Sequence, residues 1–275
     1  MPDMTQLSRA ELFRRLHTEG GPLVLPNAWD AASAALVERA GAAAVATTSG
    51  AVAWSLGAAD GDRLPWAELA AAVRRIAGTV SVPVTADCES GGPDPAGVAE
   101  TVRQVLDAGA VGVNLEDGGV PLRPVGEQAE RIAAARSAAD ALGVPLFVNA
   151  RVDVFLYKVG ERAERLPETV RRATAYAEAG ADGIFVPGVL APAVLTELVE
   201  RIPLPVNVLT GPGGPTIAEL AATGVRRISL GTALAEAAYA TARRAAAELL
   251  STGTYDSLTD AVAYPDMQAL FPGRS

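Results

Sequence analysis

Short apolar segments recur along the chain, and each is followed by a longer segment in which apolar residues, many of them alanine, recur at helical spacing. The short segments are apolar throughout rather than alternating, which is typical of parallel strands buried on both faces. They predict eight strands, at residues 23–26, 43–47, 82–86, 111–115, 146–150, 183–186, 205–209 and 227–230. Helices are predicted at 31–40, 66–78, 95–108, 125–142, 167–179, 192–201, 216–222 and 233–250.

Eight strand–helix units favour an α/β fold closed into a (β/α)8 barrel over an open sheet. An open dinucleotide-binding sheet would need a glycine-rich fingerprint after its first strand, where this chain has Pro26-Asn27-Ala28-Trp29. Several predicted helices end in a glycine that suits a left-handed cap, namely Gly41, Gly109 and Gly180.

No interdomain linker is evident, so we expect one barrel domain over residues 1–275. Ser8 and Glu11 have the spacing of a capping box and predict an N-terminal helix over 8–18. A helical tail is expected over 233–275, packed on its own barrel or on a neighbour, with a flexible end as the alternative.

Composition narrows the classes of partner and site. A net charge of −9 over 275 residues argues against a nucleic-acid partner. The single cysteine, Cys88, excludes an internal disulfide and a cysteine-based zinc site, and the single histidine, His17, excludes a histidine-rich metal site. Residues 1–11 lack a signal-peptide core and no apolar run approaches the ~20 residues that span a bilayer, so we expect a cytoplasmic protein without membrane contact.

Polar side chains follow several predicted strands at the point where each strand ends. Active sites of (β/α)8 barrels lie at these carboxyl ends. Asp87, Glu89 and Glu116 are carboxylates at the ends of consecutive buried strands and are costly there without a cation between them. Oxygen ligands of this kind predict a Mg²⁺ site, with Mn²⁺ as a substitute. Arg151 would then pair with negative charge that develops on an anionic substrate.

Each of these residues also has a plainer interpretation. A single acid at a strand end is commonly a helix N-cap or a salt-bridge partner. Arg151 could balance Asp153 or Glu116 structurally. Cys88 is interpreted as a packing residue, His17 as a surface residue of a helix, and the glycine- and proline-rich segment 211–215 as a turn rather than a phosphate loop.

The order and spacing of seven motifs resemble the isocitrate lyase/phosphoenolpyruvate mutase superfamily, in particular its short methylisocitrate lyase-like and phosphonomutase-like members. The motifs are Leu25-Pro26-Asn27-Ala28-Trp29-Asp30, Thr48-Ser49-Gly50-Ala51, Ser55-Leu56-Gly57-Ala58-Ala59-Asp60, Thr85-Ala86-Asp87-Cys88-Glu89, Asn114-Leu115-Glu116-Asp117, Asn149-Ala150-Arg151 and Ser229-Leu230-Gly231-Thr232. The resemblance implies a barrel whose C-terminal helix is exchanged between subunits of a homotetramer, a dimer of dimers.

The resemblance also implies roles for individual residues. Asp87 corresponds to the direct Mg²⁺ ligand, and Glu89 and Glu116 to acids that hold the metal through water. Asp60 corresponds to an active-site acid, and Arg151 to the arginine that stabilises an enolate-like intermediate. The backbone of Ser49, Gly50 and Ala51 corresponds to a turn that holds the substrate carboxylate; Asn207, at the mouth of the predicted barrel, is expected to contact substrate as well.

The segment after the fourth predicted strand departs from the family pattern. Residues 118–125 contain no cysteine, histidine or lysine, whereas lyases of the family carry a Lys-x-Cys-Gly-His type motif there, and the phosphonate enzymes a lysine- or asparagine-bearing loop. What remains is the shared chemistry. We therefore expect a Mg²⁺-dependent lyase that cleaves a carbon–carbon bond of a small 2-oxo or 2-hydroxy carboxylic acid through an enolate. Its proton would come from water, Tyr157 or another group. The alternatives are a phosphonate P–C bond enzyme and a non-catalytic barrel that binds small acids.

Overall fold

The predicted barrel is present in a computed structural model that describes residues 4–271. Within that range, nine parallel strands are hydrogen-bonded in the order β1-β9-β8-β7-β6-β5-β4-β3-β2. They are β1 (Leu23–Leu25), β2 (Asn27–Ala28), β3 (Val45–Thr47), β4 (Val84–Asp87), β5 (Gly112–Glu116), β6 (Phe147–Arg151), β7 (Gly183–Phe185), β8 (Val206–Leu209) and β9 (Arg227–Ser229).

The first predicted strand, at 23–26, is divided in two at Pro26. Proline lacks the N–H that a central strand needs, so the ladder is interrupted there. Before Pro26, β1 pairs with β9, and after it β2 pairs with β3, so the two halves together close the ring. The Asn27 side chain spans this seam: its amide donates to the Thr47 carbonyl over 2.8 Å, and its oxygen accepts from the N–H groups of Leu230 and Gly231.

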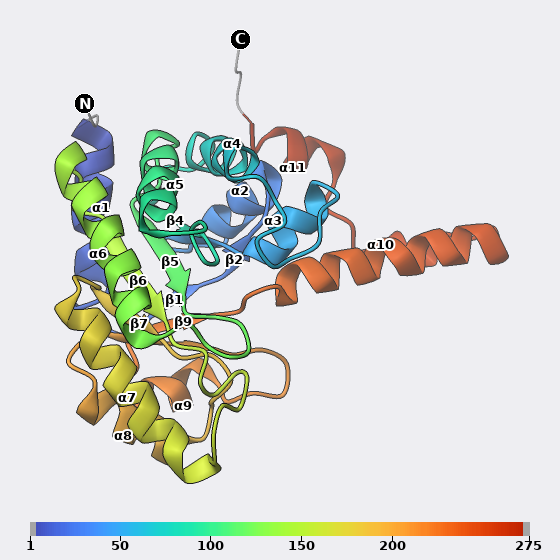
Figure 1. Ribbon diagram of the computed structural model, residues 1–275. Helices are drawn as coiled ribbons and strands as arrows, with labels where there is room; N and C mark the ends of the chain where they lie inside the picture. Colours follow the sequence, from blue (N-terminus) through green and yellow to red (C-terminus); the bar gives the residue numbers. More distant parts are fainter. Residues whose placement is uncertain (1–3, 272–275) are drawn as a thin grey trace.

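Helices surround the strands, as Figure 1 shows. Asp30 and Asp94 accept hydrogen bonds from the N–H groups of Ser33 and Gly97 and cap α2 and α5. Gly41, Gly109 and Gly180 have φ between 96° and 102°, which confirms their left-handed conformation after α2, α5 and α7. The helices of the barrel are α2 (Ala31–Arg39), α3 (Ser49–Ser55), α4 (Trp66–Ala77), α5 (Pro95–Asp107), α6 (Val125–Leu142), α7 (Arg162–Glu178), α8 (Pro192–Arg201) and α9 (Ile217–Ala222).

Two of these helices differ from the prediction. The helix α7 begins at Arg162 rather than at Pro167, because the Glu164 carboxylate accepts from the N–H of Glu161 and stabilises an earlier first turn. Pro167 then lies inside the helix. The short helix α3 was not predicted at all: its seven residues follow β3 directly and are too few to show helical periodicity.

The N-terminal helix α1 (Met4–Leu16) covers the bottom of the barrel. It begins four residues before the predicted start, so Ser8 lies inside the helix and the expected capping box does not form its N-terminus. Phe13 is fully buried, and a Cβ added to Gly112 of β5 would lie 2.7 Å from its ring. The helix therefore plugs the end of the barrel opposite the carboxyl ends of the strands.

The interpretation of His17 as a surface residue is wrong. His17 is buried beneath the barrel, with its ring stacked 3.8 Å from that of Phe147 and its Nδ1 2.7 Å from the Phe13 carbonyl oxygen. Burial, and then the positive charge of Arg227, lower the pKa of His17 to about 3. The imidazole is therefore neutral, and its Nδ1 donates to Phe13.

The C-terminal helix α10 (Ala233–Ser251) extends away from the barrel in Figure 1. Ala235, near its start, is its one buried residue, and Leu250, near its end, is 86% exposed. A 3-10 turn η1 (Asp256–Leu258) and a short helix α11 (Tyr264–Gln268) follow it, and the predicted tail continues into 272–275, outside the described residues. No helix within 4–271 combines the length and apolar character needed to cross a bilayer.

Candidate active site

A pocket of about 320 Å³ opens at the carboxyl ends of the strands, where the sequence predicted the site. Five of the predicted residues line it, namely Ser49, Gly50, Asp60, Asp87 and Arg151. The other four, Ala51, Glu89, Glu116 and Asn207, are not among its lining residues. Four further lining residues, Asn27, Thr48, Ser229 and Thr232, are polar side chains that the sequence places at strand ends. The pocket wall also contains residues that sequence reasoning did not assign to it, namely Asn114, Leu156, Phe185, Pro187, Leu209, Arg227 and Gly231.

Asp87 is the last residue of β4 and is tied to the end of β3. Its N–H donates to the Thr47 hydroxyl over 2.8 Å, and its Oδ2 accepts from the Ser49 N–H over 3.0 Å. The predicted turn at Ser49–Ala51 is thus the first turn of α3, and its first N–H points at the carboxylate. This helix start favours negative charge beside it.

Asp60 lies against the same turn. A Cβ added to Gly50 would be 3.3 Å from the Asp60 carboxylate and 3.1 Å from the Thr232 methyl group. Glycine at this position therefore allows the close approach of Asp60 to α3, and Asp60, Asp87 and Arg151 line the same pocket.

Glu89 and Glu116 have raised pKa values because they are buried and lie near other carboxylates. Burial, and then Asp60, Asp62 and Asp87, raise the pKa of Glu89 to about 7, although a hydrogen bond from the Asp62 N–H opposes the shift. Burial is also the main cause that raises the pKa of Glu116 to about 8; Arg151 opposes it, while Asp153, Asp87 and Glu89 add to it. A cation among these acids would relieve both effects.

The acids do not form a ready-made metal shell. Over residues 4–271, no three His, Cys, Asp or Glu side chains are gathered closely enough to hold an ion directly. Mg²⁺ keeps several of its waters and takes only one or two carboxylates, so Asp87 as a direct ligand with Glu89 and Glu116 holding waters is an arrangement that suits it. The all-oxygen character of these groups fits Mg²⁺ or Mn²⁺.

Arg151, the last residue of β6, is clamped between two carboxylates. Its Nη1 lies 2.5 Å from Glu116 Oε2, and its Nε lies 2.7 Å from Asp153 Oδ1. Burial alone would lower the pKa of Arg151, but Glu116, Asp153 and Asp87 outweigh it and raise the pKa above its usual value. The guanidinium is thus permanently charged, held in one orientation and exposed to the pocket.

Below the mouth, amide side chains form a polar layer inside the barrel. Asn149 donates to the side-chain oxygens of Asn114 and Asn207 over 2.9 and 3.0 Å, and Arg227 donates to Asn114 over 3.1 Å. Asn207, expected to bind substrate, donates its own amide to the Val208 carbonyl and belongs to this layer. Arg227 is fully buried, and burial lowers its pKa to about 9, while Asp87 opposes the shift.

The arginine at Arg227 was missed by sequence reasoning. It begins an apolar run and is separated by one residue from Ser229, so period-two alternation was the signal that both face the interior. Cys88, by contrast, is fully buried as predicted, and burial followed by Asp87 and Glu89 raises the pKa of its thiol.

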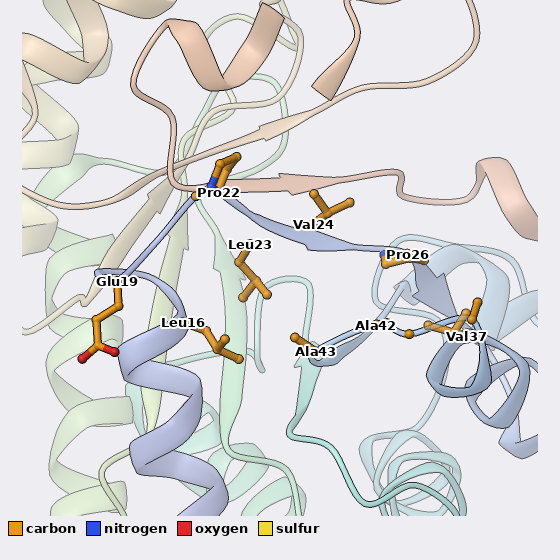
Figure 2. A pocket seen from close by; sticks show the side chains of 12 residues that line it. Leu16, Glu19, Pro22, Leu23, Val24, Pro26, Val37, Ala42 and Ala43 are labelled. Carbon is orange, nitrogen blue, oxygen red and sulfur yellow. The ribbon is translucent and has the colours of Figure 1, made fainter. Parts of the chain in front are cut away.

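A larger hollow, of about 480 Å³, lies near the amino-terminal ends of β1 and β3, at the opposite end of the barrel. Figure 2 shows that mostly aliphatic side chains line it, among them Leu16, Leu23 and Val37, with Glu19 as the one ionisable group. It contains none of the predicted site residues and no set of groups for acid–base or metal chemistry, so the mouth pocket is the candidate active site.

Comparison with known proteins gives a consistent family. The profile of the phosphoenolpyruvate phosphomutase family matches residues 13–250. An uncharacterised protein of Mycobacterium tuberculosis is 40% identical over 94% of this chain and 95% of its own length. The 2-methylisocitrate lyase of Bacillus subtilis is 30% identical over 73% of this chain and 67% of its own length. A crystal structure of phosphoenolpyruvate phosphomutase from Streptomyces platensis is 28% identical, with a TM-score of 0.83 and 95% of each chain covered.

Proposed function

Because this chain belongs to the isocitrate lyase/phosphoenolpyruvate mutase superfamily of lyases and mutases, we propose that it is a Mg²⁺-dependent carbon–carbon lyase. The substrate would be a small 2-oxo or 2-hydroxy carboxylic acid, cleaved next to its carbonyl or hydroxyl carbon. The observation that carries the proposal is Arg151, held charged and oriented on the pocket wall that also contains Asp87.

Residues in the pocket wall and directly behind it would share substrate binding and charge stabilisation. Asp87 would hold the metal directly, with Glu89 and Glu116 holding its waters, and Mg²⁺ would supply Lewis-acid polarisation of the substrate carbonyl. The first turn of α3, at Ser49, Gly50 and Ala51, would orient the substrate carboxylate.

Arg151 would stabilise the charge that appears during cleavage. When the carbon–carbon bond breaks by decarboxylation or retro-aldol cleavage, its electron pair passes into an enolate and negative charge grows on oxygen. A guanidinium that is already held by Glu116 and Asp153 needs no reorientation at that moment, so its attraction for the new charge lowers the barrier.

The proton that quenches the enolate would come from water or from Tyr157. Burial, and then Asp153 and Glu116, raise the pKa of the Tyr157 hydroxyl, so it remains protonated at neutral pH. Its side chain is 42% exposed and sits on the segment after β6, two residues after Phe155 and next to the pocket residue Leu156. Tyr157 is not itself a lining residue, so it would donate from the segment that borders the pocket.

Binding of oxalate, a mimic of an enolised 2-oxo acid, tests the proposal. Oxalate should raise the melting temperature of the protein when Mg²⁺ is present and not when EDTA replaces it, and Asp87→Asn should abolish the shift. A panel of 2-oxo and 2-hydroxy acids, assayed for release of carbon dioxide or of a ketone product, should then reveal turnover. Binding without turnover on the whole panel would favour a barrel that only binds small acids.

Phosphonate chemistry is the second candidate, supported by the match to the phosphoenolpyruvate phosphomutase profile. Incubation with phosphonopyruvate and Mg²⁺, followed by phosphorus NMR, distinguishes it from the lyase. A phosphate ester or inorganic phosphate signal would establish P–C bond cleavage, and an unchanged phosphonate signal would exclude it.

A further inference from the structure

Directly after β5, Asp117 is completely buried and engaged on both carboxylate oxygens. Its Oδ2 accepts from the Arg172 guanidinium over 2.9 Å and from the Tyr176 hydroxyl over 2.8 Å, and its Oδ1 accepts from the Asp153 N–H over 2.9 Å. A buried carboxylate is costly unless it is paired and hydrogen-bonded in this way. Asp117 does not line the pocket, and the catalytic roles proposed above do not use it.

These contacts hold the backbone between Arg151 and Asp153. The Asp117 N–H donates to the Arg151 carbonyl oxygen over 3.2 Å, and its carboxylate fixes the backbone of Asp153. The Asp153 carboxylate in turn accepts from Arg151 Nε over 2.7 Å. Two successive links, each at hydrogen-bonding distance, therefore join Asp117 to the guanidinium at the pocket wall.

The other side of the cluster is anchored in α7. Arg172 also donates to the Glu168 carboxylate over 2.8 Å and to the Arg123 carbonyl oxygen over 2.9 Å. The Arg123 N–H donates to the Asp117 carbonyl oxygen over 3.0 Å, so the segment between Asp117 and Arg123 is attached at both ends. Burial, and then the charge of Asp117, raise the pKa of Tyr176, which keeps its hydroxyl protonated and donating.

We propose that Asp117, gripped by Arg172 and Tyr176, is a positioning residue that sets the orientation of Arg151 for the reaction. The inference rests on the proposed function, because it assigns to Arg151 the charge-stabilising step. It goes beyond that function by placing part of the catalytic geometry in α7, outside the pocket. A purely structural ion pair would stabilise the fold and leave the orientation of Arg151 unchanged.

Two variants remove hydrogen bonds to Asp117 without changing a residue that lines the pocket. Tyr176→Phe removes one hydroxyl from Asp117 and keeps the buried ring, and Arg172→Met removes the charge while keeping much of the aliphatic stem. We expect kcat to fall roughly ten- to a hundredfold with KM within about threefold, because misplacing a charge-stabilising group affects the transition state more than substrate binding. Arg172→Lys should recover part of the lost kcat.

Arg136→Met is the matched control. Arg136 on α6 pairs with Asp182 immediately before β7, at the amino-terminal end of the strands, so it too joins a helix to a buried strand end. It should lower the melting temperature comparably and leave kcat unchanged. Equal losses of kcat in the control and in Tyr176→Phe, or no loss in either Tyr176→Phe or Arg172→Met, would overturn the positioning role.

A second readout does not depend on turnover. The Nε–H NMR signal of Arg151, identified by its absence in Arg151→Lys, should be sharp and slow to exchange in the natural protein because Asp153 accepts it. It should broaden or shift in Tyr176→Phe and Arg172→Met and persist in Arg136→Met. An unchanged signal in both variants refutes the inference even if the lyase is active, whereas a changed signal in a protein without lyase activity refutes the proposed function alone.

Discussion

Gly50 occupies a tightly packed point of the candidate site. The space that a side chain would need there is taken by the Asp60 carboxylate and the Thr232 methyl group, at 3.3 and 3.1 Å from an added Cβ. Both neighbours line the pocket, and one of them would have to shift by a few tenths of an ångström to admit a methyl group. The residue is therefore glycine because of close approach; its backbone conformation imposes no such requirement.

Gly50→Ala should weaken the Mg²⁺-dependent binding of oxalate by roughly tenfold or more, because the methyl group displaces Asp60 or Thr232 from the pocket wall. Isothermal titration calorimetry measures the effect. Gly126→Ala is the matched control: Gly126 lies in α6 with nothing within 4 Å of an added Cβ, and this change should stabilise the protein by about 0.5–1 kcal/mol without affecting oxalate. Unaltered oxalate affinity in Gly50→Ala would show that Gly50 does not shape the site.

Tyr157→Phe tests the proton donor. If the hydroxyl supplies the proton, the variant should cleave substrate with kcat reduced about a hundredfold, as expected for the loss of a general acid, while its oxalate affinity stays the same. A solvent isotope effect on kcat should grow as protonation becomes limiting. Unchanged kcat would assign the proton to water.

Residues at strand ends were predictable because the barrel itself places them. Asp87 and Arg151 each follow a group of mainly apolar residues. Because the carboxyl ends of parallel strands share one face, their convergence required no knowledge of side-chain packing. Asn207 and Arg227 were not predictable in the same way. Whether an inward side chain reaches the pocket or the layer beneath it depends on its height in the barrel, which is set by the stagger of the strands.

Among the elements, α1 shows why the hydrophobic pattern of a segment does not suffice to predict which of its residues are buried. Its sequence has only weak amphipathic character. Nothing in α1 or in His17 just after it indicates that Phe13 and His17 would insert beneath the barrel, because their burial depends on Gly112 and Phe147, which lie far along the chain. The split of the first strand at Pro26 has a local cause, the missing N–H, and was foreseeable. The start of α7 depended on a Glu164 side chain that also suits a loop.

His17 makes the stability of the protein pH-dependent. Above pH 7 the imidazole is neutral in both folded and unfolded states. Below about pH 6.5 the unfolded chain binds a proton at His17, whereas the buried ring, with a pKa of about 3, stays unprotonated. The free energy of unfolding therefore falls as the pH falls, by up to ~1.4 kcal/mol per pH unit. Urea unfolding at pH 7.5, 6.0 and 5.0 should show that His17→Phe loses less stability than the natural protein. Parallel losses in the two proteins would contradict the assignment.

On the scale of the whole molecule, the projecting α10 is the feature that one chain does not explain. Leu249 and Leu250 are 56% and 86% exposed near the end of the helix, and Tyr255 and Tyr264 beyond it are 70% and 76% exposed. Exposed apolar side chains of this number indicate an interaction surface rather than a solvated end. The arrangement suits the exchange of α10 between subunits that the family resemblance implied, and we propose that the protein is a homotetramer built from such pairs.

The mass in solution decides this proposal. Light scattering after size-exclusion chromatography should give about four times the 28.1 kDa of one chain, and Leu249→Glu combined with Leu250→Glu should reduce it, because two buried carboxylates would oppose the contact. Arg243→Ala changes an exposed polar residue of the same helix and should leave the mass unchanged. The double variant should also melt at a lower temperature that depends on protein concentration, since a protomer without its partner leaves the apolar end of α10 in water. A mass of one chain for the natural protein would rule out the exchange. The exposed apolar residues of α10 would then have to pack against the same chain.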